Sequence, residues 1–433
     1  MKKVLIITYY WPPSGGPGVQ RCLYFVKYLR EFGWEPIVYT VDKGEFPYYD
    51  YSLEKEIPDG IQILKHKAVE PFSIYKKLVG LKKEDKLKPN VVVEKSKRPL
   101  LHSIATWIRG NIFIPDARML WIKPSVKFLS AYLSENKTDA ILTSSPPHSL
   151  QLIGLELSKK FNIPWLVDLR DPWTRIFFAD KLKMSAYAKK RNLEYEKNVL
   201  SQATSIVTVS QSCAEGFKEI CGRLPYVITN GFDKVSESII RNDDNIIIAY
   251  GGTLSGDRNP EKLWIEIKNY IDKNVSLKSK IKLQFFGAID PAVYESIKSN
   301  KLGDYLETFD ALSHDEYLKR MSLADILLLV GTKNDKGVIT GKFFEYLAMK
   351  KPIISISPND SDVEIILEQT QSGKNAGYED VLKIKEIINW AIDICKNKET
   401  FQPNANEIEK YSRRILTKKL ADLLDAFSDS KYN

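Results

Sequence analysis

Two glycine-containing loops in this sequence stand where a parallel sheet could present backbone amides to a ligand. Each follows an apolar run and precedes a predicted helix: Gly15, Gly16 and Gly18 come after Val4–Thr8, and Gly251, Gly252 and Thr253 come after Ile246–Tyr250. Glycine lets the main chain approach a phosphate closely, and a helix N-terminus favours an anion. The spacing of the first loop is not the dinucleotide pattern G-x-G-x-x-G, and that loop by itself is equally compatible with a tight turn.

Charged residues near the second loop and at a later helix start could complete a nucleotide site. Arg258 could pair in bidentate fashion with a phosphate, although a surface ion pair would also explain it. Gly341, Lys342 and Phe343 open another predicted helix, where exposed amides and the lysine could meet phosphates. Glu345 is expected in the first turn of that helix. A carboxylate there could accept both vicinal hydroxyls of a ribose, or it could simply stabilise the helix dipole.

Three polar residues that follow two other predicted strands are candidates for catalytic groups. His148 follows the strand Ala140–Thr143 and a Pro-Pro turn, so we expect it to face a cleft, although a structural histidine fits equally well. Arg170 and Asp171 follow the strand Trp165–Asp168. Asp171 could polarise a substrate hydroxyl, or it could hold Arg170 through an ion pair.

Alternating strand and helix patterns are expected to position these residues. They predict an α/β fold with two doubly wound domains, residues 1–235 and 236–408, joined at the polar segment Asp233–Asn245. The closing stretch 409–433 contains a predicted helix, Ser412–Phe427, which we expect to pack back across the hinge.

Helix starts and apolar spacing indicate several individual elements. Ser313 and Glu316 form an S-x-x-E capping box, which predicts a helix that runs to about Met321. Other predicted helices span Val19–Phe32, Ser149–Lys160, Glu261–Tyr270, Lys342–Met349 and Asp380–Asn397.

Composition excludes several protein classes. The 433 residues are 43% hydrophobic and 27% charged, as in folded globular proteins. No run of eighteen apolar residues is present, which excludes a transmembrane helix. The apolar start meets Pro12 and Pro13, so we expect a buried strand rather than a signal peptide. Four cysteines and four histidines lack metal-ligand spacing, so we expect neither disulfides nor a metal, and a cytosolic protein.

Two thirds of the net charge of +9 lies in one short segment. Residues 76–98 contain nine Lys or Arg against three acidic residues. Apolar residues are interleaved with these cations and continue to residue 108, and such a pattern over 74–108 could lie on an anionic membrane. A solvated insertion would also explain it. We do not expect nucleic-acid binding, because no recognition motif or aromatic stacking platform is present.

Taken together, these motifs resemble the retaining glycosyltransferases of family 4, whose GT-B architecture has two facing Rossmann-like domains with a central cleft. The resemblance covers nearly the whole chain. It rests on the first glycine loop, on Gly251-Gly252-Thr253 with Arg258, and on these further segments: Ser144-Ser145-Pro146-Pro147-His148-Ser149, Asp168-Leu169-Arg170-Asp171-Pro172-Trp173, Thr229-Asn230-Gly231-Phe232-Asp233 and 341–352.

The resemblance implies that the C-terminal domain binds a UDP- or GDP-type nucleotide sugar and that the N-terminal domain binds the acceptor. Glu345 matches the second glutamate of an E-x7-E motif, which binds the ribose, and Arg258 matches the residue that neutralises the diphosphate. Gly15 and Gly16 would lie against the donor phosphates from across the cleft. The chain departs from the family at Gly337, where the first motif glutamate is expected, and at Arg170-Asp171, where many members have a histidine.

A metal-independent, cofactor-free hexosyl transfer with retention follows as the expected function. In such a metal-independent reaction, Arg258, Lys342 and helix N-termini would have to stabilise the leaving diphosphate. The expected acceptor is a lipid-linked or surface-polysaccharide glycan, with the protein in the cytoplasm and peripheral on the inner face of the membrane. Alternatives are an NAD-dependent oxidoreductase, or a membrane-docking protein of the same fold whose catalysis is weakened, which Gly337 leaves open.

Overall fold

The computed structural model divides into two compact units. The N-terminal unit is Met1–Thr229 with Leu416–Asn433, and the C-terminal unit is Asn230–Ile415. The structure describes residues 1–44, 46, 48–68, 99–175, 182–233, 241, 243–310, 312–397 and 400–429. The boundary expected near residue 235 lies outside these residues, as does most of the polar segment expected to link the domains.

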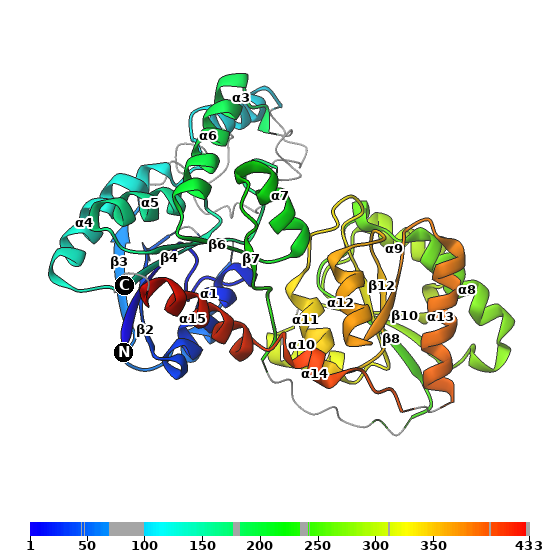
Figure 1. The fold of residues 1–433 in the computed structure, drawn as a ribbon. Helices are drawn as coiled ribbons and strands as arrows, with labels where there is room; N and C mark the ends of the chain where they lie inside the picture. Colours follow the sequence, from blue (N-terminus) through cyan, green and yellow to red (C-terminus); the bar gives the residue numbers. More distant parts are fainter. Residues whose placement is uncertain are drawn as a thin grey trace. The chain divides into compact units, whose positions relative to one another are not determined.

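The described part of the N-terminal unit contains a seven-stranded parallel sheet in the order β3-β2-β1-β4-β5-β6-β7 (Figure 1). Its strands are β1 (Lys2–Thr8), β2 (Trp34–Asp42), β3 (Gln62–Lys67), β4 (Ala140–Ser145), β5 (Trp165–Leu169), β6 (Ser205–Thr208) and β7 (Tyr226–Val227). Its helices are α1 (Pro17–Leu29), α3 (Pro99–Asn111), α4 (Ile122–Glu135), α5 (Ser149–Phe161), α6 (Ala186–Gln202), α7 (Gln211–Cys221) and most of α15 (Arg413–Asp429).

Continuous apolar runs form the central strands because helices cover both faces of the sheet. Val4 and Ile6 of β1 pack into one buried cluster, and Leu5 and Ile7 pack into another, as the two-residue period of a strand requires. The first cluster includes Leu416, Leu420 and other apolar residues of α15. The last helix of the chain therefore completes the core of the unit that the chain builds first.

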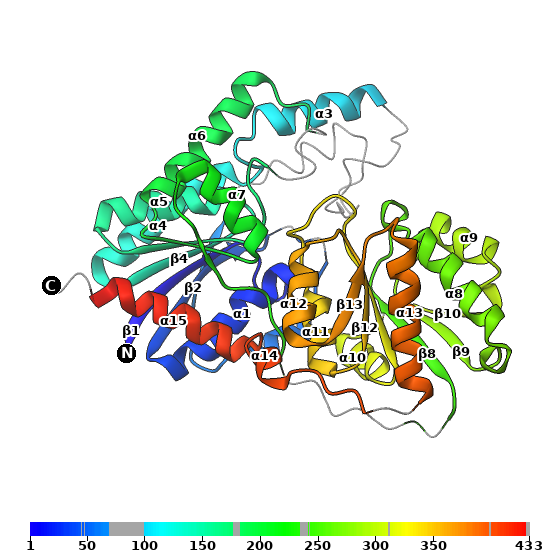
Figure 2. The same cartoon turned by 45° about the vertical axis from the view of Figure 1, so that its right-hand side comes forward.

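The described part of the C-terminal unit contains a six-stranded parallel sheet in the order β10-β9-β8-β11-β12-β13 (Figure 2). Its strands are β8 (Ile246–Gly251), β9 (Ile281–Phe286), β10 (Leu306–Phe309), β11 (Ile326–Val330), β12 (Ile353–Ile356) and β13 (Gly373–Ala376). Its helices are α8 (Glu261–Lys273), α9 (Pro291–Ser299), α10 (His314–Ser322), α11 (Gly341–Met349), α12 (Asp362–Thr370), α13 (Val381–Lys396) and α14 (Ala405–Glu409), with a 3-10 turn, η5 (Gly256–Arg258).

Both sheets have the doubly wound order, so the predicted fold class is confirmed. The capping box also starts a helix as expected, since Ser313 Oγ accepts a hydrogen bond from Glu316 N at 3.4 Å. Glu316 itself pairs with Arg320 instead of returning to the cap.

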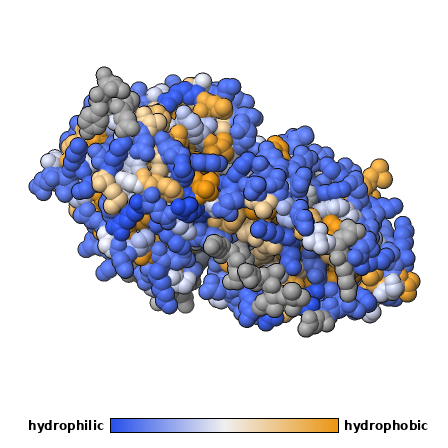
Figure 3. All heavy atoms as spheres, turned by 60° about the horizontal axis from the view of Figure 1, so that its bottom comes forward, coloured by the Kyte–Doolittle hydropathy of each residue, from blue (hydrophilic) through white to orange (hydrophobic). Residues whose placement is uncertain are grey.

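Apolar side chains on the face in Figure 3 form small groups separated by hydrophilic residues. Among the described residues we find no helix with both the length and the apolar character needed to cross a bilayer.

Candidate functional site

The candidate donor-site residues of the C-terminal unit come from loops at the point where its strand order reverses. Strands β8 and β11 are neighbours in the sheet although β9 and β10 separate them in the chain. In open parallel sheets, ligands bind outside the carboxyl ends of such a pair. The loop after β8 carries Gly252, Thr253 and Arg258, and the loop after β11 leads into α11, which carries Lys342 and Glu345.

The glycines at the end of β8 are required by close packing. Gly252 and Gly287 have φ values of 96° and 124°, in the region that side chains disfavour. A Cβ on Gly287 would lie 2.7 Å from the carbonyl oxygen of Gly252. The ring of Tyr317 lies against Gly251 so closely that a side chain there would overlap it. Gly252 and Thr253 are nevertheless exposed, so their main chain is accessible to a ligand.

Lys342 reaches back from α11 to this glycine loop. Its Nζ donates hydrogen bonds to Tyr250 Oη at 2.8 Å and to the carbonyl oxygen of Gly251 at 2.9 Å. The same nitrogen lies 4.0 Å from the centroid of the Tyr250 ring. Burial, and next the charge of Arg258, lower the pKa of Lys342 to about 7, against a smaller opposing effect of Glu345. Lys342 therefore exchanges its proton near neutral pH.

Arg258 ends the 3-10 turn η5 next to the same loop. Its Nε is buried and has no hydrogen-bond partner among the described residues. Tyr378 Oη donates to the carbonyl oxygen of Gly331 at 2.8 Å and lies 3.4 Å from that of Arg258, which ties the loops after β8 and β11 together. In the part of the chain that the structure describes, neither Arg258 nor Lys342 forms an ion pair with a carboxylate. Two cations thus share this corner without an anionic partner.

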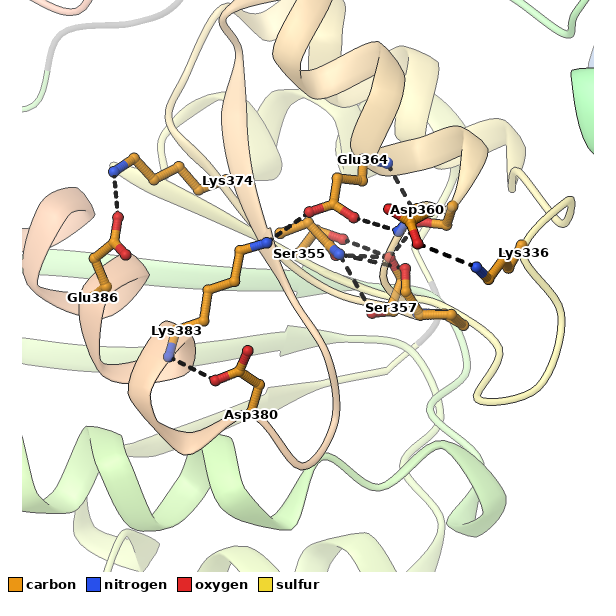
Figure 4. A network of polar contacts seen from close by, with 12 residues as sticks. Lys336, Ser355, Ser357, Asp360, Glu364, Lys374, Asp380, Lys383 and Glu386 are labelled. Atoms are coloured by element: carbon orange, nitrogen blue, oxygen red, sulfur yellow. Dashed lines mark hydrogen bonds and ion pairs between the residues drawn. The ribbon is translucent and has the colours of Figure 1, made fainter.

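A neighbouring polar network at the ends of β12 and β13 is different, because its cations are paired (Figure 4). Lys383 contacts Glu364 at 2.7 Å, Lys374 contacts Glu386 at 2.8 Å, and Lys336 lies 3.4 Å from Asp360. Several buried side chains complete it through mutual hydrogen bonds: Ser355, Ser357, Ser361 and Asn375. The lysines of this network are therefore paired with its own carboxylates, and the network connects the ends of β12 and β13 to the segments around them.

Glu345 lies one turn deeper in α11 than expected. It is the fifth residue of the helix, beyond the first turn, so the prediction that it sits among the free amides is wrong. Its Oε1 lies 2.9 Å from Nε2 of His314, the first residue of α10. That hydrogen bond raises the pKa of His314. Sequence reasoning missed His314, although it stands inside the recognised capping box and is one of only four histidines.

The other residues at the start of α11 have structural positions. Phe343 is fully buried in the core, and its amide donates to the carbonyl oxygen of Thr340 at 3.1 Å, so neither group is directed at a ligand. Gly341 is the first residue of the helix, and Thr340, at its N-cap, has a buried Oγ1 with no partner among the described residues. Gly337 is buried, and its amide donates to Asp335 at 2.9 Å.

In the N-terminal unit, Tyr48 covers the first glycine loop. A Cβ on Gly15 would overlap the Tyr48 ring, and one on Gly16, whose φ is 106°, would lie 2.7 Å from the Tyr48 hydroxyl. The amide of Gly15 also donates to the carbonyl oxygen of Tyr48 at 3.1 Å. Glycine is therefore needed here for contact with a side chain of the same unit.

Arg170 joins this loop to the Ser-Ser-Pro-Pro-His segment after β4. Its guanidinium donates to three carbonyl oxygens, those of Gly18 at 2.6 Å, Ser145 at 3.0 Å and Pro146 at 2.9 Å. These contacts assign Arg170 to holding two loops in register, and Asp171 beside it is exposed.

His148 is buried beside those loops and stays neutral at physiological pH. Its ring stacks on Trp173, with centroids 4.7 Å apart and planes 8° apart. Its Nδ1 lies 3.2 Å from Ser145 Oγ. Burial lowers the pKa of His148 to about 4, although Asp116 acts in the opposite direction. The sequence placed His148 next to this turn, but stacking on Trp173 was not predictable from spacing.

The apolar part of the predicted membrane segment is described only from residue 99 onward, in α3. Residues 74–98 lie outside the described residues. Ile104 and Trp107 of α3 and Ile112 just after it are 46%, 49% and 54% exposed. The C-terminal end of α3 meets the N-terminal end of α6 (Figure 2), where Asn111 Oδ1 accepts a hydrogen bond from Ser185 N at 2.7 Å.

Within the described ranges, we find no group of three or more His, Cys, Asp or Glu side chains placed to hold a metal ion. Metal independence therefore stays a prediction about the reaction.

Comparisons with known proteins support the fold. No protein-family model matches the sequence, and no curated protein matches it. Sucrose-phosphate synthase from Thermosynechococcus elongatus superimposes with a TM-score of 0.62 at 14% identity, over 99% of this chain and 100% of that chain. HepE from Anabaena, solved with UDP-glucose, gives 0.61 at 14% identity, over 98% and 100%.

A provisionally assigned UDP-N-acetylglucosamine 2-epimerase from Listeria monocytogenes also matches, with a TM-score of 0.53 at 11% identity over 99% of this chain and 98% of that chain. Likeness at such low identity establishes architecture and not activity. The two doubly wound sheets and these neighbours together show that the chain has the GT-B fold, with two Rossmann-like domains.

Proposed function

We propose that this protein is a glycosyltransferase that moves a hexosyl group from a UDP- or GDP-type nucleotide sugar to a lipid-linked or surface-polysaccharide acceptor, without a metal and with retention. One observation carries the proposal. Arg258 and Lys342 meet at the glycine loop after β8, and neither has a carboxylate partner among the described residues, while the neighbouring lysines are paired. Uncompensated cations beside exposed main-chain amides are suited to a diphosphate.

The same cluster can support departure of the diphosphate. Negative charge grows on the leaving group during transfer, and preorganised cations stabilise it better than water does. Arg258 supplies a fixed charge, and Lys342 supplies a proton-dependent one because its pKa lies near 7. The Glu345 carboxylate on α11 is available to accept hydrogen bonds from ribose hydroxyls.

On the acceptor side we assign different roles to the three candidates. Arg170 is a positioning residue, because its donors are used on carbonyl oxygens of two loops. His148 is neutral at pH 7 and could accept a proton, and Asp171 is exposed and could orient an acceptor hydroxyl. The structure of the N-terminal unit favours Asp171 over Arg170 for direct contact with the acceptor.

A panel of nucleotides and nucleotide sugars tests the proposal. UDP, GDP and their sugars should raise the melting temperature of the wild-type protein, and Glu345→Ala should weaken this response, whereas Glu368→Ala, an exposed glutamate on α12, should not. Donor turnover is then measured with both variants. Binding of NAD without any response to UDP or GDP would favour the oxidoreductase. An epimerised nucleotide sugar as the product would favour epimerisation, and turnover unaffected by Glu345→Ala would overturn the site.

We also propose that the face of α3 contacts an anionic membrane surface. Ile104, Trp107 and Ile112 are exposed apolar residues directly after the basic segment, and apolar side chains next to cations bind anionic bilayers. Trp107→Ser should reduce co-sedimentation with vesicles that contain phosphatidylglycerol, and added salt should do the same. Leu382→Ser, which removes an exposed leucine from α13, is the control. Equal sedimentation of Trp107→Ser and wild type would contradict the membrane proposal without touching the catalytic one.

A further inference from the structure

His314 and Glu345 form a polar pair that joins two helices at the candidate donor site. His314 is the first residue of α10, directly after the N-cap Ser313, and Glu345 lies in the second turn of α11. Nε2 of the histidine lies 2.9 Å from Oε1 of the glutamate. The histidine side chain is 42% exposed, but the glutamate side chain is only 13% exposed. An enclosed carboxylate is therefore held by a ring that solvent can reach.

The pair leaves half of the carboxylate available. Oε1 receives the histidine, whereas Oε2 accepts no hydrogen bond from the described residues. Oε2 is also absent from the buried polar atoms that lack a partner, so it remains in contact with solvent. A carboxylate fixed through one oxygen presents the other in a defined direction, and fixing that direction in advance reduces the entropy cost of binding.

The charges around His314 favour its protonated form on balance. Glu345 raises the pKa of His314 chiefly through the hydrogen bond, and Asp315 on its own helix acts in the same direction. Partial burial and Arg413, at the start of α15, act in the opposite direction. The Tyr317 ring faces the histidine with centroids 6.3 Å apart. Around Glu345, Lys342 is the nearby cation, but its nitrogen is bonded to Tyr250 and Gly251.

Nothing in the core requires this pair. The ring of His314 is 42% exposed, so its loss opens no cavity, and an ion pair with one solvent-accessible partner contributes only modestly to stability. Glu345 is the residue whose orientation depends on it, since α11 by itself leaves the side chain free to take several rotamers.

We propose that His314 is a positioning residue that fixes the Glu345 carboxylate for a ribose diol, and that it thereby makes the protein select ribonucleotides over 2′-deoxyribonucleotides. This inference rests on the proposed function, because it places the ribose at Glu345. With Oε1 held by His314, Oε2 and the remaining lone pair of Oε1 accept the two vicinal hydroxyls. A 2′-deoxy sugar leaves one of these acceptors unpaired in an enclosed site, which lowers affinity.

The direct test compares dissociation constants for UDP and dUDP, and for GDP and dGDP, in wild type and His314→Ala. We expect the wild-type protein to prefer the ribose form of the nucleotide it binds by about tenfold or more. In His314→Ala we expect this preference to fall to about threefold or less, mainly through weaker binding of the ribose form. His314→Gln, whose amide can donate to Oε1, should restore part of the preference.

A pH series provides the readout that separates positioning from structural support. The ribose preference of the wild type should be greatest below the raised pKa of His314 and should decline as the pH rises through it, whereas His314→Gln should show no such decline. Arg320→Ala removes a comparable exposed cation from α10, where it pairs with Glu316 at 2.9 Å, and should leave the preference unchanged. Melting temperatures of all variants should match wild type.

The outcomes separate this inference from the proposed function. If neither UDP nor GDP binds the wild-type protein, the proposed function fails. If one of them binds and the ribose preference is the same in wild type and His314→Ala, the function stands and the positioning role of His314 is refuted. Loss of all binding in His314→Ala together with a lowered melting temperature, and without rescue by His314→Gln, would also refute it, because a merely structural role would then explain the histidine.

Discussion

Replacing Lys342 with methionine should remove a proton that the protein takes up when it binds a nucleoside diphosphate. In the free protein, burial and Arg258 hold the pKa of Lys342 at about 7. A bound diphosphate would supply the negative charge that this corner lacks, and the pKa should return toward its ordinary value of about 10.4. Binding and protonation are then linked, and methionine, which is of similar length, cannot take part.

The size of the effect follows from that shift. At pH 8 a lysine with a pKa of about 7 is about one tenth protonated, so binding should take up about 0.9 proton. Affinity should fall as the pH rises above 7, by up to about tenfold per unit, until the pKa of the bound state is reached. Below pH 6 the lysine is already charged and the uptake should approach zero. The terminal phosphate of the ligand, with a pKa of about 6, is fully ionised at pH 8 and does not obscure the measurement.

The free energy of unfolding should also depend on pH because of Lys342, and the direction of this dependence follows from its lowered pKa. The native pKa is lower than the unfolded one, so the unfolded chain binds the extra proton between pH 7 and about 10.4, and native stability rises with pH over this window. A shift from 10.5 to about 7 corresponds to roughly 5 kcal/mol as an upper bound, and we expect about half of it because Lys342 keeps some exposure. The penalty is complete below pH 7.

Isothermal titration of UDP and GDP at pH 8 in HEPES and in Tris measures the uptake directly, because the two buffers differ in ionisation enthalpy. The wild type and Lys385→Met, which alters an exposed lysine on α13, should give the same proton number. Lys342→Met should bind more weakly and with almost no uptake. Tight binding by the wild type without net proton uptake at pH 8 would refute the reasoning, as would unchanged uptake in Lys342→Met.

Three further variants test other parts of the structure. In the native protein, the buried Asp168 accepts a hydrogen bond from the Arg21 guanidinium at 2.8 Å, so Arg21→Ala leaves a buried carboxylate without its cation and should lower the free energy of unfolding by about 3–5 kcal/mol in urea denaturation. A loss below about 1 kcal/mol would show that the pair is solvated. Glu196→Gln should raise the melting temperature at pH 8 but not near pH 4, because burial raises the pKa of Glu196 and its Oε1 has no partner among the described residues. The same change in melting temperature at pH 8 and at pH 4 would contradict this prediction. In Gly287→Ala the new Cβ would lie 2.7 Å from the carbonyl oxygen of Gly252, so the variant should displace Gly252 and weaken UDP or GDP binding in a thermal-shift titration. Unaltered binding would show that the loop is not part of the site.

The order of elements was largely predictable from local sequence. Apolar runs such as Ile326–Val330 can be satisfied only as buried strands between helices, and the serine of a Ser-x-x-Glu sequence can accept a hydrogen bond from a free amide at a helix start, as Ser313 does. Some helices were not predicted. One of them is α6, whose sequence is polar on average and in which buried residues such as Val199 and Leu200 are outnumbered by polar ones. Burial against a neighbour decides such helices, and local spacing does not record it.

The chemistry of individual site residues depended on contacts between segments that are distant in the chain. The sequence by itself determined that two glycine loops, Arg258, Lys342 and Glu345 follow strands of parallel sheets. Only the tertiary structure decided that Lys342 is bonded to the loop 91 residues earlier and that Glu345 is held by His314, 31 residues away. Charge state and orientation are set by burial and by partners brought together through packing, so a motif can identify a residue without determining what its side chain is free to do.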